Sequence, residues 1–587
     1  MRLPALATVL GLAAPLALAF GLAACGGFAS DGAGSSAPYS DTTSGDAFAN
    51  SSWTDPSTQY GAADTTMASD TWSPPTYADA ASADTASADT AGGPLPAADT
   101  TGGDKFEAPG TNPFVVAGHD PFSTFGADVD TASYELFKRY VQQYGQLPVP
   151  ASVRLEEFVN YFHYDYPAPA WDAERPFNVA VEAAPSAFSD TTLLRVGVQG
   201  KVVPPDLKAP ANLVFLVDVS GSMASSDKLD LVKVLLRETL NVLAPDDTVA
   251  IVTYSTTIRV VLGPTAVAHK ALINEQIAAL EAGGSTAGQA GLALAYQVAE
   301  QGRIEGGVNH VLLCTDGDFN VGPSSTSEMV DFITAKRLTG ITLTVVGFGT
   351  GNLNDAMMEA VSNAGDGVYA YIGDADSAVA YANTRMLGSI YFIAKDLKIQ
   401  LAFNPATVYA YRLLGYENNA IADVQFVDDT VDAGEVGSGH AVTALYELVL
   451  TGDAVPAVAG APALEDGITY DGVDLPTFGP EDVVEVRIRY KRPGASVEDP
   501  ALPVDYMVDA HRIFDTFAET SADFQWASAV AAFAEILKGS PYARSANLAE
   551  IGSVVAAQAD RDVDRSEFVG LFTAARTLLA AASGAGQ

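Results

Sequence analysis

The stretch that decides the fold is NLVFLVDVSGSMASSDKLDLVKVLL, from Asn212 to Leu236. Its first part is a run of apolar residues suited to a buried strand, and its last part reads as a helix. Between them three oxygen-bearing side chains, Asp218, Ser220 and Ser222, occupy alternate positions. Carboxylate and hydroxyl oxygens are the ligands that hard cations prefer, so the turn after this strand is a candidate metal site.

Strand and helix patterns alternate from this stretch to about residue 388. Apolar strands occur at LVFLVDVS, TVAIVTYS, VNHVLLCTDG, ITLTVVGFG and VYAYIG, and helical patterns lie between them. This order predicts an α/β fold with a doubly wound, mostly parallel, Rossmann-like sheet. The segment TIRVVLGP follows its predecessor too closely for a crossover helix, so we expect an antiparallel edge strand there.

Two further oxygen side chains follow other elements of the predicted sheet. Thr286 lies in the glycine-rich segment EAGGSTAGQAG, which opens a helix, and Asp316 follows the strand VNHVLLCT. Ligands of open α/β sheets bind beyond the carboxyl ends of the strands, so we expect all five side chains at one edge. This donor set contains no histidine or cysteine and favours Mg²⁺, with Mn²⁺ or Ca²⁺ as alternatives. Such a site leaves the ion short of a ligand, and an Asp or Glu of a protein partner can complete its coordination.

The whole constellation resembles a von Willebrand factor type A domain over residues 211–388, and its five side chains match that domain's metal-ion-dependent adhesion site. The resemblance implies that these side chains hold the ion directly or through water and that a ligand's carboxylate takes the free position. The segments STFGADVDTASY, VRLEEFVNYFHYDYP, GYEN, DDTVDAGEVGSGHAVTALYE and AVAAFAEILKGS resemble bacterial von Willebrand factor type A lipoproteins of the YfbK-like group. One departure is Asn419 after GYEN, where that group usually carries arginine.

The N-terminus has the pattern of a secretory signal. A short positive start precedes an uncharged apolar run that ends LALAFGLAAC, and its last four residues, Leu22 to Cys25, resemble a bacterial lipobox. We therefore predict cleavage before Cys25 and a lipid on that cysteine, which gives a stable anchor. A plain transmembrane anchor is the alternative. Glycines follow Cys25, and by resemblance to Gram-negative lipoproteins this favours the outer membrane, on its periplasmic or surface face.

The chain is strongly acidic. Its 587 residues include 72 aspartates and glutamates against 31 lysines and arginines, which gives a formal charge of −41. That balance argues against a nucleic-acid partner and against electrostatic docking on anionic lipid. Besides Cys25 the only cysteine is Cys314, in an apolar strand, so we expect a buried thiol and no internal disulfide. Two cysteines and six scattered histidines also argue against a zinc site.

Changes of pattern divide the chain into six segments. Asp130 is expected to cap a helix that runs to about Gly145. The strands of residues 177–203 are expected to pair with those of 396–492 in one sandwich, into which the α/β domain is inserted. The segments are a signal peptide at 1–24, a disordered acidic tether at 25–112, an N-terminal α+β region at 113–206, the α/β domain at 207–389, a β-rich domain at 390–495 and a helical region at 496–587.

The predicted function is binding of a protein partner through the metal site of a lipid-anchored envelope protein, without catalysis. Two alternatives stay open. In a structural scaffold the metal would only stabilise the loops, whereas a metal-dependent hydrolase would need a general base, for which Asp318 is the nearby spare carboxylate. The segment DVDT from Asp128 to Thr131 resembles a phosphatase nucleophile motif, but it lacks the preceding apolar strand, so we interpret it as a helix cap.

Overall fold

The computed structural model describes residues 103–317, 326–468, 475–496 and 499–584. The signal peptide, Cys25, most of the tether and Asp318 therefore lie outside the described residues. Ordered structure begins earlier than predicted, because Phe106 is buried in the core of the α/β domain. Asp104 accepts hydrogen bonds from the backbone N–H groups of Gly351 and Leu353, at 2.6 and 2.9 Å. The predicted end of the tether at residue 112 is therefore wrong.

The α/β domain contains a six-stranded sheet in the order β10-β9-β8-β5-β6-β7. All neighbouring strands are parallel except β7, which joins β6 antiparallel at the edge, as predicted. The parallel strands are apolar along most of their length because helices cover both of their faces. The strands are β5 (Ala211–Asp218), β6 (Thr248–Tyr254), β7 (Ile258–Ala266), β8 (Val308–Thr315), β9 (Thr342–Phe348) and β10 (Tyr369–Ile372).

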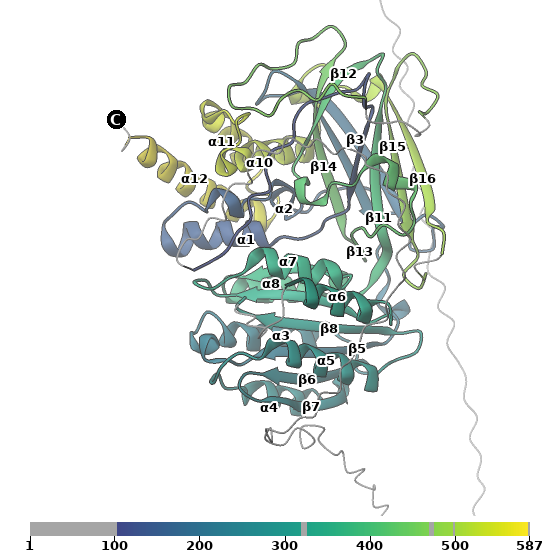
Figure 1. Ribbon diagram of the computed structural model, residues 1–587. Helices are drawn as coiled ribbons and strands as arrows, with labels where there is room; N and C mark the ends of the chain where they lie inside the picture. Colours follow the sequence, from purple (N-terminus) through teal and green to yellow (C-terminus); the bar gives the residue numbers. More distant parts are fainter. Residues whose placement is uncertain (1–102, 318–325, 469–474, 497–498, 585–587) are drawn as a thin grey trace, which may run out of the picture. The chain divides into compact units, whose positions relative to one another are not determined.

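Helices cover both faces of this sheet (Figure 1), so the predicted doubly wound fold is confirmed. Helices α5, α6 and α7 share one apolar core with the sheet, and α3, α4, α8 and α9 share the other. Cys314 is buried in the second core, and this burial raises the pKa of its thiol. The helices are α3 (Leu229–Val242), α4 (Lys270–Ala278), α5 (Gly288–Gln301), α6 (Thr326–Arg337), α7 (Asp355–Ala364), α8 (Ala375–Thr384) and α9 (Met386–Ile390).

Two antiparallel sheets with a common apolar core form a β-sandwich. One sheet has the order β1-β12-β14-β4-β3, and the other has the order β13-β11-β15-β16 with β2 also paired to β11. Strand β4 pairs with β14, so the ladder predicted between residues 177–203 and 396–492 is present. The strands are β1 (Val115–Val116), β2 (Phe122–Gly126), β3 (Phe177–Pro185), β4 (Thr192–Gly200), β11 (Phe392–Phe403), β12 (Val408–Leu414), β13 (Val436–Gly437), β14 (Ala441–Leu450), β15 (Asp482–Lys491) and β16 (Leu502–Asp509).

The chain leaves the sandwich for the α/β domain and returns to it at one place. Lys201 follows β4, and Tyr391 precedes β11. The N–H of Gly439 donates to the carbonyl of Lys201 at 3.0 Å, and the N–H of Ser438 donates to the carbonyl of Tyr391 at 2.8 Å. One short loop therefore holds both connections, as expected for a domain inserted into the sandwich.

The first helix does not begin as predicted. Helix α1 (Ala132–Arg139) has Thr131 at its N-cap, without a side-chain cap bond, and continues as a π-helix (Tyr140–Tyr144). Asp130 instead accepts a hydrogen bond at 2.8 Å from the backbone N–H of Tyr369, in strand β10. A contact distant in the sequence thus replaces the local cap. The segment DVDT does lie at the start of the helix, with Thr131 at the N-cap, but no side chain of it caps the helix.

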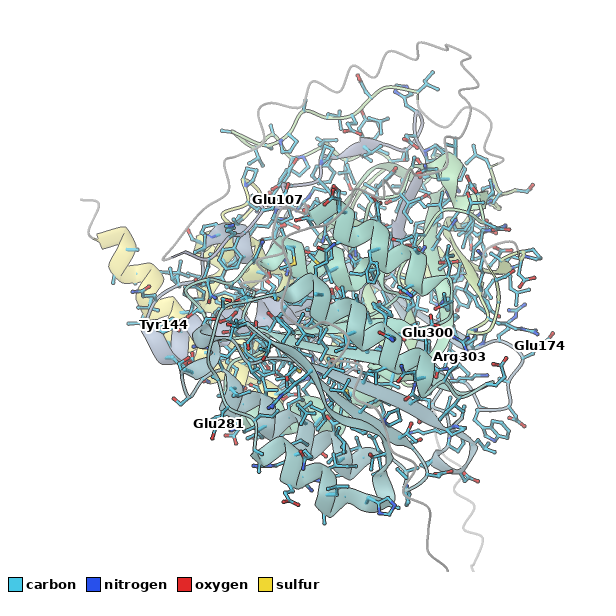
Figure 2. The ribbon with its side chains drawn as sticks, turned by 60° about the horizontal axis from the view of Figure 1, so that its bottom comes forward. Glu107, Tyr144, Glu174, Glu281, Glu300 and Arg303 are labelled. Carbon is cyan, nitrogen blue, oxygen red and sulfur yellow. The ribbon has the colours of Figure 1, made fainter. Side chains whose placement is uncertain are left out.

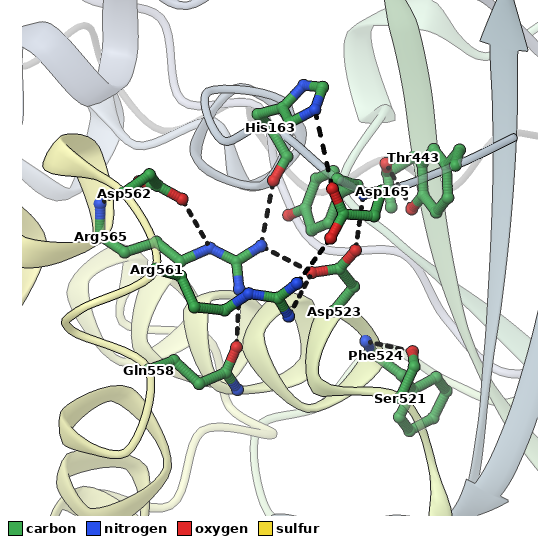
Figure 3. A network of polar contacts seen from close by, with 12 residues as sticks. His163, Asp165, Thr443, Ser521, Asp523, Phe524, Gln558, Arg561, Asp562 and Arg565 are labelled. Carbon is green, nitrogen blue, oxygen red and sulfur yellow. Dashed lines mark hydrogen bonds and ion pairs between the residues drawn. The ribbon is translucent and has the colours of Figure 1, made fainter. Parts of the chain in front are cut away.

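The remaining helices form an apolar group with part of the sandwich. A polar network ties two of them to the segment after α2 (Figure 3). Asp523 accepts hydrogen bonds from Arg565 and from the backbone N–H of Asp165, both at 2.7 Å. Within the described ranges, no helix has the length and apolar character that a membrane crossing requires. These helices are α2 (Leu155–Val159), α10 (Ala522–Lys538), α11 (Leu548–Ala556) and α12 (Val563–Gly584).

Candidate metal site

The first three predicted ligands lie together where β5 ends. Asp218 is the last residue of this strand, and its side chain is fully buried. Its Oδ1 accepts a hydrogen bond from the N–H of Ser220 at 2.8 Å, which fixes the turn after the strand. The hydroxyl oxygens of Ser220 and Ser222 are 3.0 Å apart. One carboxylate and two hydroxyls therefore converge at this edge of the sheet.

Asp316 follows β8, which is the neighbour of β5 in the sheet. Its side chain is also fully buried. Burial raises the pKa of Asp218 to about 6, opposed by hydrogen bonds from Ser220 and supported by the negative charge of Asp316. The negative charges of Asp218 and Asp316 therefore repel each other, as expected for two carboxylates close enough to bind one cation.

Thr286 lies in the loop between α4 and α5 and is half-buried. Two backbone hydrogen bonds tie this loop to the turn after β5: Gly221 N–H to the carbonyl of Gly284 at 2.9 Å, and Gly283 N–H to the carbonyl of Val219 at 2.7 Å. Figure 2 labels Glu281, near the start of this loop, and Glu300 and Arg303 at the other end of α5. Among the hydrogen bonds of the described chain, none involves the hydroxyl of Thr286. These backbone bonds hold the loop that carries Thr286 beside the turn after β5.

Sequence reasoning missed Lys228, a cation within the site. Its Nζ donates to Oδ2 of Asp316 at 2.9 Å and to Oδ1 of Asn352 at 3.0 Å. Burial opposes ionisation of Asp316, but hydrogen bonds from Lys228 and Ser222 outweigh it and hold the pKa of this carboxyl below its usual value. Gly349, with φ of 71°, leaves room for the lysine stem, because a Cβ there would overlap it. A lysine near the start of a helix was visible in the sequence, but its long-range partners were not.

The donor set fits a hard divalent cation. All of its side chains offer oxygen, and type A domains commonly hold such an ion with these groups. Lys228 compensates the charge of Asp316, so the protein supplies little net negative charge to an ion at this edge. An ion held here would remain electrophilic and would attract a further carboxylate. Asp318, the base considered for a hydrolase, lies outside the described residues.

A second group of carboxylates lies near the amino-terminal end of β10. This is the end of the parallel strands opposite to the one that carries Asp218 and Asp316. Asp366, Asp432 and Glu435 each place one oxygen within 4.8 Å of the others. Asn419, the departure from the family pattern, lines a cavity that Asp432 and Glu435 also line. Sequence reasoning gave these positions no role beyond the resemblance of the segments that contain them, because their carboxylates come from distant parts of the chain.

Comparisons with known proteins cover most of the chain after the tether. The von Willebrand factor type A domain family matches residues 212–383, a family described as von Willebrand factor matches residues 100–195, and one described as uncharacterized protein YfbK, C-terminal, matches residues 388–578. Uncharacterized protein YfbK of Escherichia coli is 37% identical over 454 residues, covering 75% of each chain.

Two other similarities are more distant. Uncharacterized protein sll0103 of Synechocystis is 29% identical over 186 residues, which are 32% of this chain and 43% of that protein. The solved structure of a von Willebrand factor type A protein from Catenulispora acidiphila aligns with a TM-score of 0.39 and 15% identity, covering 69% of this chain and 90% of the other.

Proposed function

Because the chain belongs to the YfbK-like family of von Willebrand factor type A proteins, we propose that it binds a protein partner through a divalent metal ion. A type A domain supports a role in protein interaction or adhesion. The observation that carries the finer proposal is the meeting of Asp218, Ser220 and Ser222 with Asp316 at one sheet edge. These four groups and Thr286 would hold the ion, which we take to be Mg²⁺ or a similar cation.

The ion would supply one coordination position for an Asp or Glu of the partner. The chain's own residues orient and compensate the site. Ser220 holds Asp218 in place through its N–H, and Lys228 offsets the charge of Asp316. The chain as a whole carries a formal charge of −41, so an acidic partner is repelled except where a cation meets it. This arrangement makes the metal the specific point of contact for an acidic group.

We also propose that the protein is anchored in the cell envelope. A lipid on Cys25 would attach the protein to the envelope, with the outer membrane favoured by the residues that follow this cysteine. The acidic segment between Cys25 and the folded part would give the binding edge reach from the lipid surface. We infer a binding role without catalysis, since the described polar groups at the site act as ligands or compensate them.

The test is retention of partners from an envelope extract by the purified protein, in Mg²⁺ and in EDTA. The wild type is compared with Asp218→Ala and with Ser226→Ala, which changes an exposed serine farther along the same loop. We expect a protein that is retained by the wild type and by Ser226→Ala in Mg²⁺ only, and not by Asp218→Ala. Identical sets of retained proteins in every condition would contradict metal-dependent binding.

A scaffold role for the metal is the second candidate. It predicts that Mg²⁺ raises the melting temperature without changing which proteins are retained. The backbone bonds between Gly221 and Gly284 and between Gly283 and Val219 already join the two loops. Because the loops are tied without an ion, the geometry favours the binding role over the scaffold role.

A further inference from the structure

A cavity of about 210 Å³ is lined by parts of both the sandwich and the α/β domain. Its walls come from residues 126–130 after β2, residues 418–421 after β12, residues 432–435 before β13, and the ends of the loop between α7 and β10. Four carboxyl-bearing residues, Asp128, Asp130, Asp432 and Glu435, are among those that line it. None of them belongs to the candidate metal site at the carboxyl ends of β5 and β8, which we call the adhesion site (Asp218, Ser220, Ser222, Thr286 and Asp316).

Close backbone packing brings two of these segments together. Ala127 N–H donates to the carbonyl of Leu397, and Leu397 N–H donates to the carbonyl of Gly434, both at 3.0 Å. Gly434 lies so close to Ala127 that a Cβ on it would overlap the carbonyl oxygen of Ala127. The next residues along the chain, Asp128 and Glu435, are therefore neighbours in space although they are far apart in the sequence.

Hydrogen bonds orient the first two carboxylates. Oδ1 of Asp128 accepts the N–H of Asp130 at 2.7 Å, and Oδ1 of Asp130 accepts the N–H of Tyr369 at 2.8 Å. Each carboxylate thus uses one oxygen to fix its position. For the second oxygen of each, the described part of the chain records no hydrogen bond, so both retain an oxygen for a ligand.

Glu435 provides an independent sign that a ligand belongs here. Only 6% of this residue is exposed, and it lines the cavity. Its Oε1 is buried and makes no hydrogen bond with any described residue. Buried polar atoms are nearly always paired, so an unpaired carboxylate oxygen at a cavity needs an explanation. A cation bound in the cavity would provide the missing partner.

Nearby cations compensate only part of the charge. Arg337 contacts both Asp366 and Asp432, and Lys395 contacts Asp366. Burial, together with the charges of Asp366 and Asp432, raises the pKa of Glu435 well above its usual value. Burial and neighbouring carboxylates likewise raise the pKa of Asp128 to about 7 and that of Asp130 well above its usual value. The cavity therefore carries an excess of acidic groups.

We propose that Asp128, Asp130, Asp432 and Glu435 form a second divalent-cation site, of the calcium type, which we name the junction site. The donors are all oxygen, which excludes metals that prefer nitrogen or sulfur. They come from separate segments, and Ca²⁺ tolerates such irregular shells of six to eight oxygens, with water and backbone carbonyls completing them. An ion here would join the segment after β2 to the segment before β13, in a cavity that Asn363 and Gly367 of the α/β domain also line.

The test counts calcium ions in a protein whose adhesion site is disabled. Calorimetric titration of Asp218→Ala with Ca²⁺ isolates the junction site, and we expect one ion per chain. Adding Glu435→Gln, which keeps the size of the side chain and removes its charge, should weaken that binding by roughly 100-fold or more. Glu535→Gln is the matched control, because Glu535 is also a buried glutamate whose oxygens accept no hydrogen bond from any described residue, but it lies beside Arg412, away from the cavity.

Two results would overturn the junction site. One is an Asp218→Ala protein that binds no Ca²⁺, and the other is a Glu435→Gln double variant that binds it as before. Asp128→Asn in the Asp218→Ala background repeats the test if the Glu435 variant does not fold, judged by circular dichroism. The junction site does not depend on the proposed adhesion site. A wild type that binds no more ions than Asp218→Ala would contradict only the adhesion site.

Discussion

The adhesion site and the junction site lie at opposite ends of the parallel strands, and they differ in how their negative charge is compensated. At the adhesion site Asp316 is fully buried and paired with the ammonium group of Lys228. At the junction site Glu435 is almost as buried, yet its Oε1 has no partner among the described residues. A buried carboxylate with its own cation is stable before any metal arrives, whereas one without a cation favours metal binding. The candidate adhesion site is thus compensated without an ion, whereas the proposed junction site would depend on one.

The largest expected effect comes from removing the built-in cation. Lys228→Met keeps the length of the stem but leaves Asp316 buried and uncompensated. We expect the free energy of unfolding in EDTA to fall by about 3–5 kcal/mol, the usual cost of breaking a buried ion pair. Urea denaturation measures this loss, and Mg²⁺ should recover part of it.

The control for Lys228→Met is Lys233→Met. Lys233 lies in α3, which Lys228 directly precedes, and makes a 3.9 Å ion pair with an Asp230 side chain that is 70% exposed. Such surface pairs contribute little, so we expect a change below about 1 kcal/mol. If the two variants lose the same stability, Lys228 is not the compensating group that we describe.

The second prediction is a gain of stability instead of a loss. Glu435→Gln replaces a buried carboxyl whose Oε1 has no hydrogen-bond partner among the described residues, and its amide can donate to the neighbouring carboxylates. We expect the calcium-free protein to gain about 1–3 kcal/mol of unfolding free energy, the range for relieving an unsatisfied buried polar group. The same denaturation experiment with Ca²⁺ should show a smaller gain or a loss. A destabilised calcium-free variant would contradict our account of the junction site.

The third prediction concerns pH. Burial, with Glu417 and Asp128 adding to it, raises the pKa of Glu156 to about 7, and burial raises that of Glu157 to about 7 against the pull of Arg154. The folded protein therefore binds more protons than the unfolded chain between about pH 4.5 and 7. We expect the calcium-free protein to become more stable by about 2 kcal/mol for each of these carboxyls as pH falls from 7.5 to 5.

Urea denaturation at several pH values measures this slope, and Glu156→Gln should flatten it. Asp316, whose pKa is lowered, contributes stability that is lost as the pH falls. That loss occurs below the ordinary pKa range of an aspartate and so lies outside this pH window. Asp218 and Asp128, whose pKa values are raised to about 6 and about 7, add to the slope with the same sign. Stability that falls steadily from pH 7.5 to 5 would show that these carboxyls are ionised in the fold.

The smallest expected effect is that of Asn419→Arg. This half-buried residue lines the cavity of the junction site, so the new guanidinium would lie beside its carboxylates. We expect less than about 1 kcal/mol of change in the calcium-free protein, as for a partly exposed ion pair. The stabilisation by Ca²⁺, measured as a shift of the melting temperature, should decrease. An undiminished shift would place the ion away from Asn419.

The regular part of the fold could be predicted from the sequence because it follows local rules. Alternating strands and helices require a doubly wound sheet, and parallel strands place Asp218 and Asp316 at the same edge. Contacts between distant segments could not be predicted in this way. Lys228 reaches Asp316 and Asn352, which lie far along the chain.

The incorrect predictions have the same origin. Asp130 precedes a helix and satisfies the rule for a cap, yet its carboxylate bonds to Tyr369 in another domain. Phe106 lies in a polar segment with no periodicity, but its buried ring and the hydrogen bonds of Asp104 attach that segment to the α/β domain. In both cases tertiary contacts outweigh a local preference, and a single sequence does not show such contacts.

The insertion of the α/β domain also determines where a mechanical load would go. The domain is connected to the sandwich through β4 and β11, which belong to different sheets. Strand β4 is paired on both sides, with β3 and β14, and β11 is likewise paired with β2 and β15. Tension on the domain would have to tear interior strands from two neighbours each, in both sheets at once. A load applied to the α/β domain would therefore act on strands that are hydrogen-bonded along both sides.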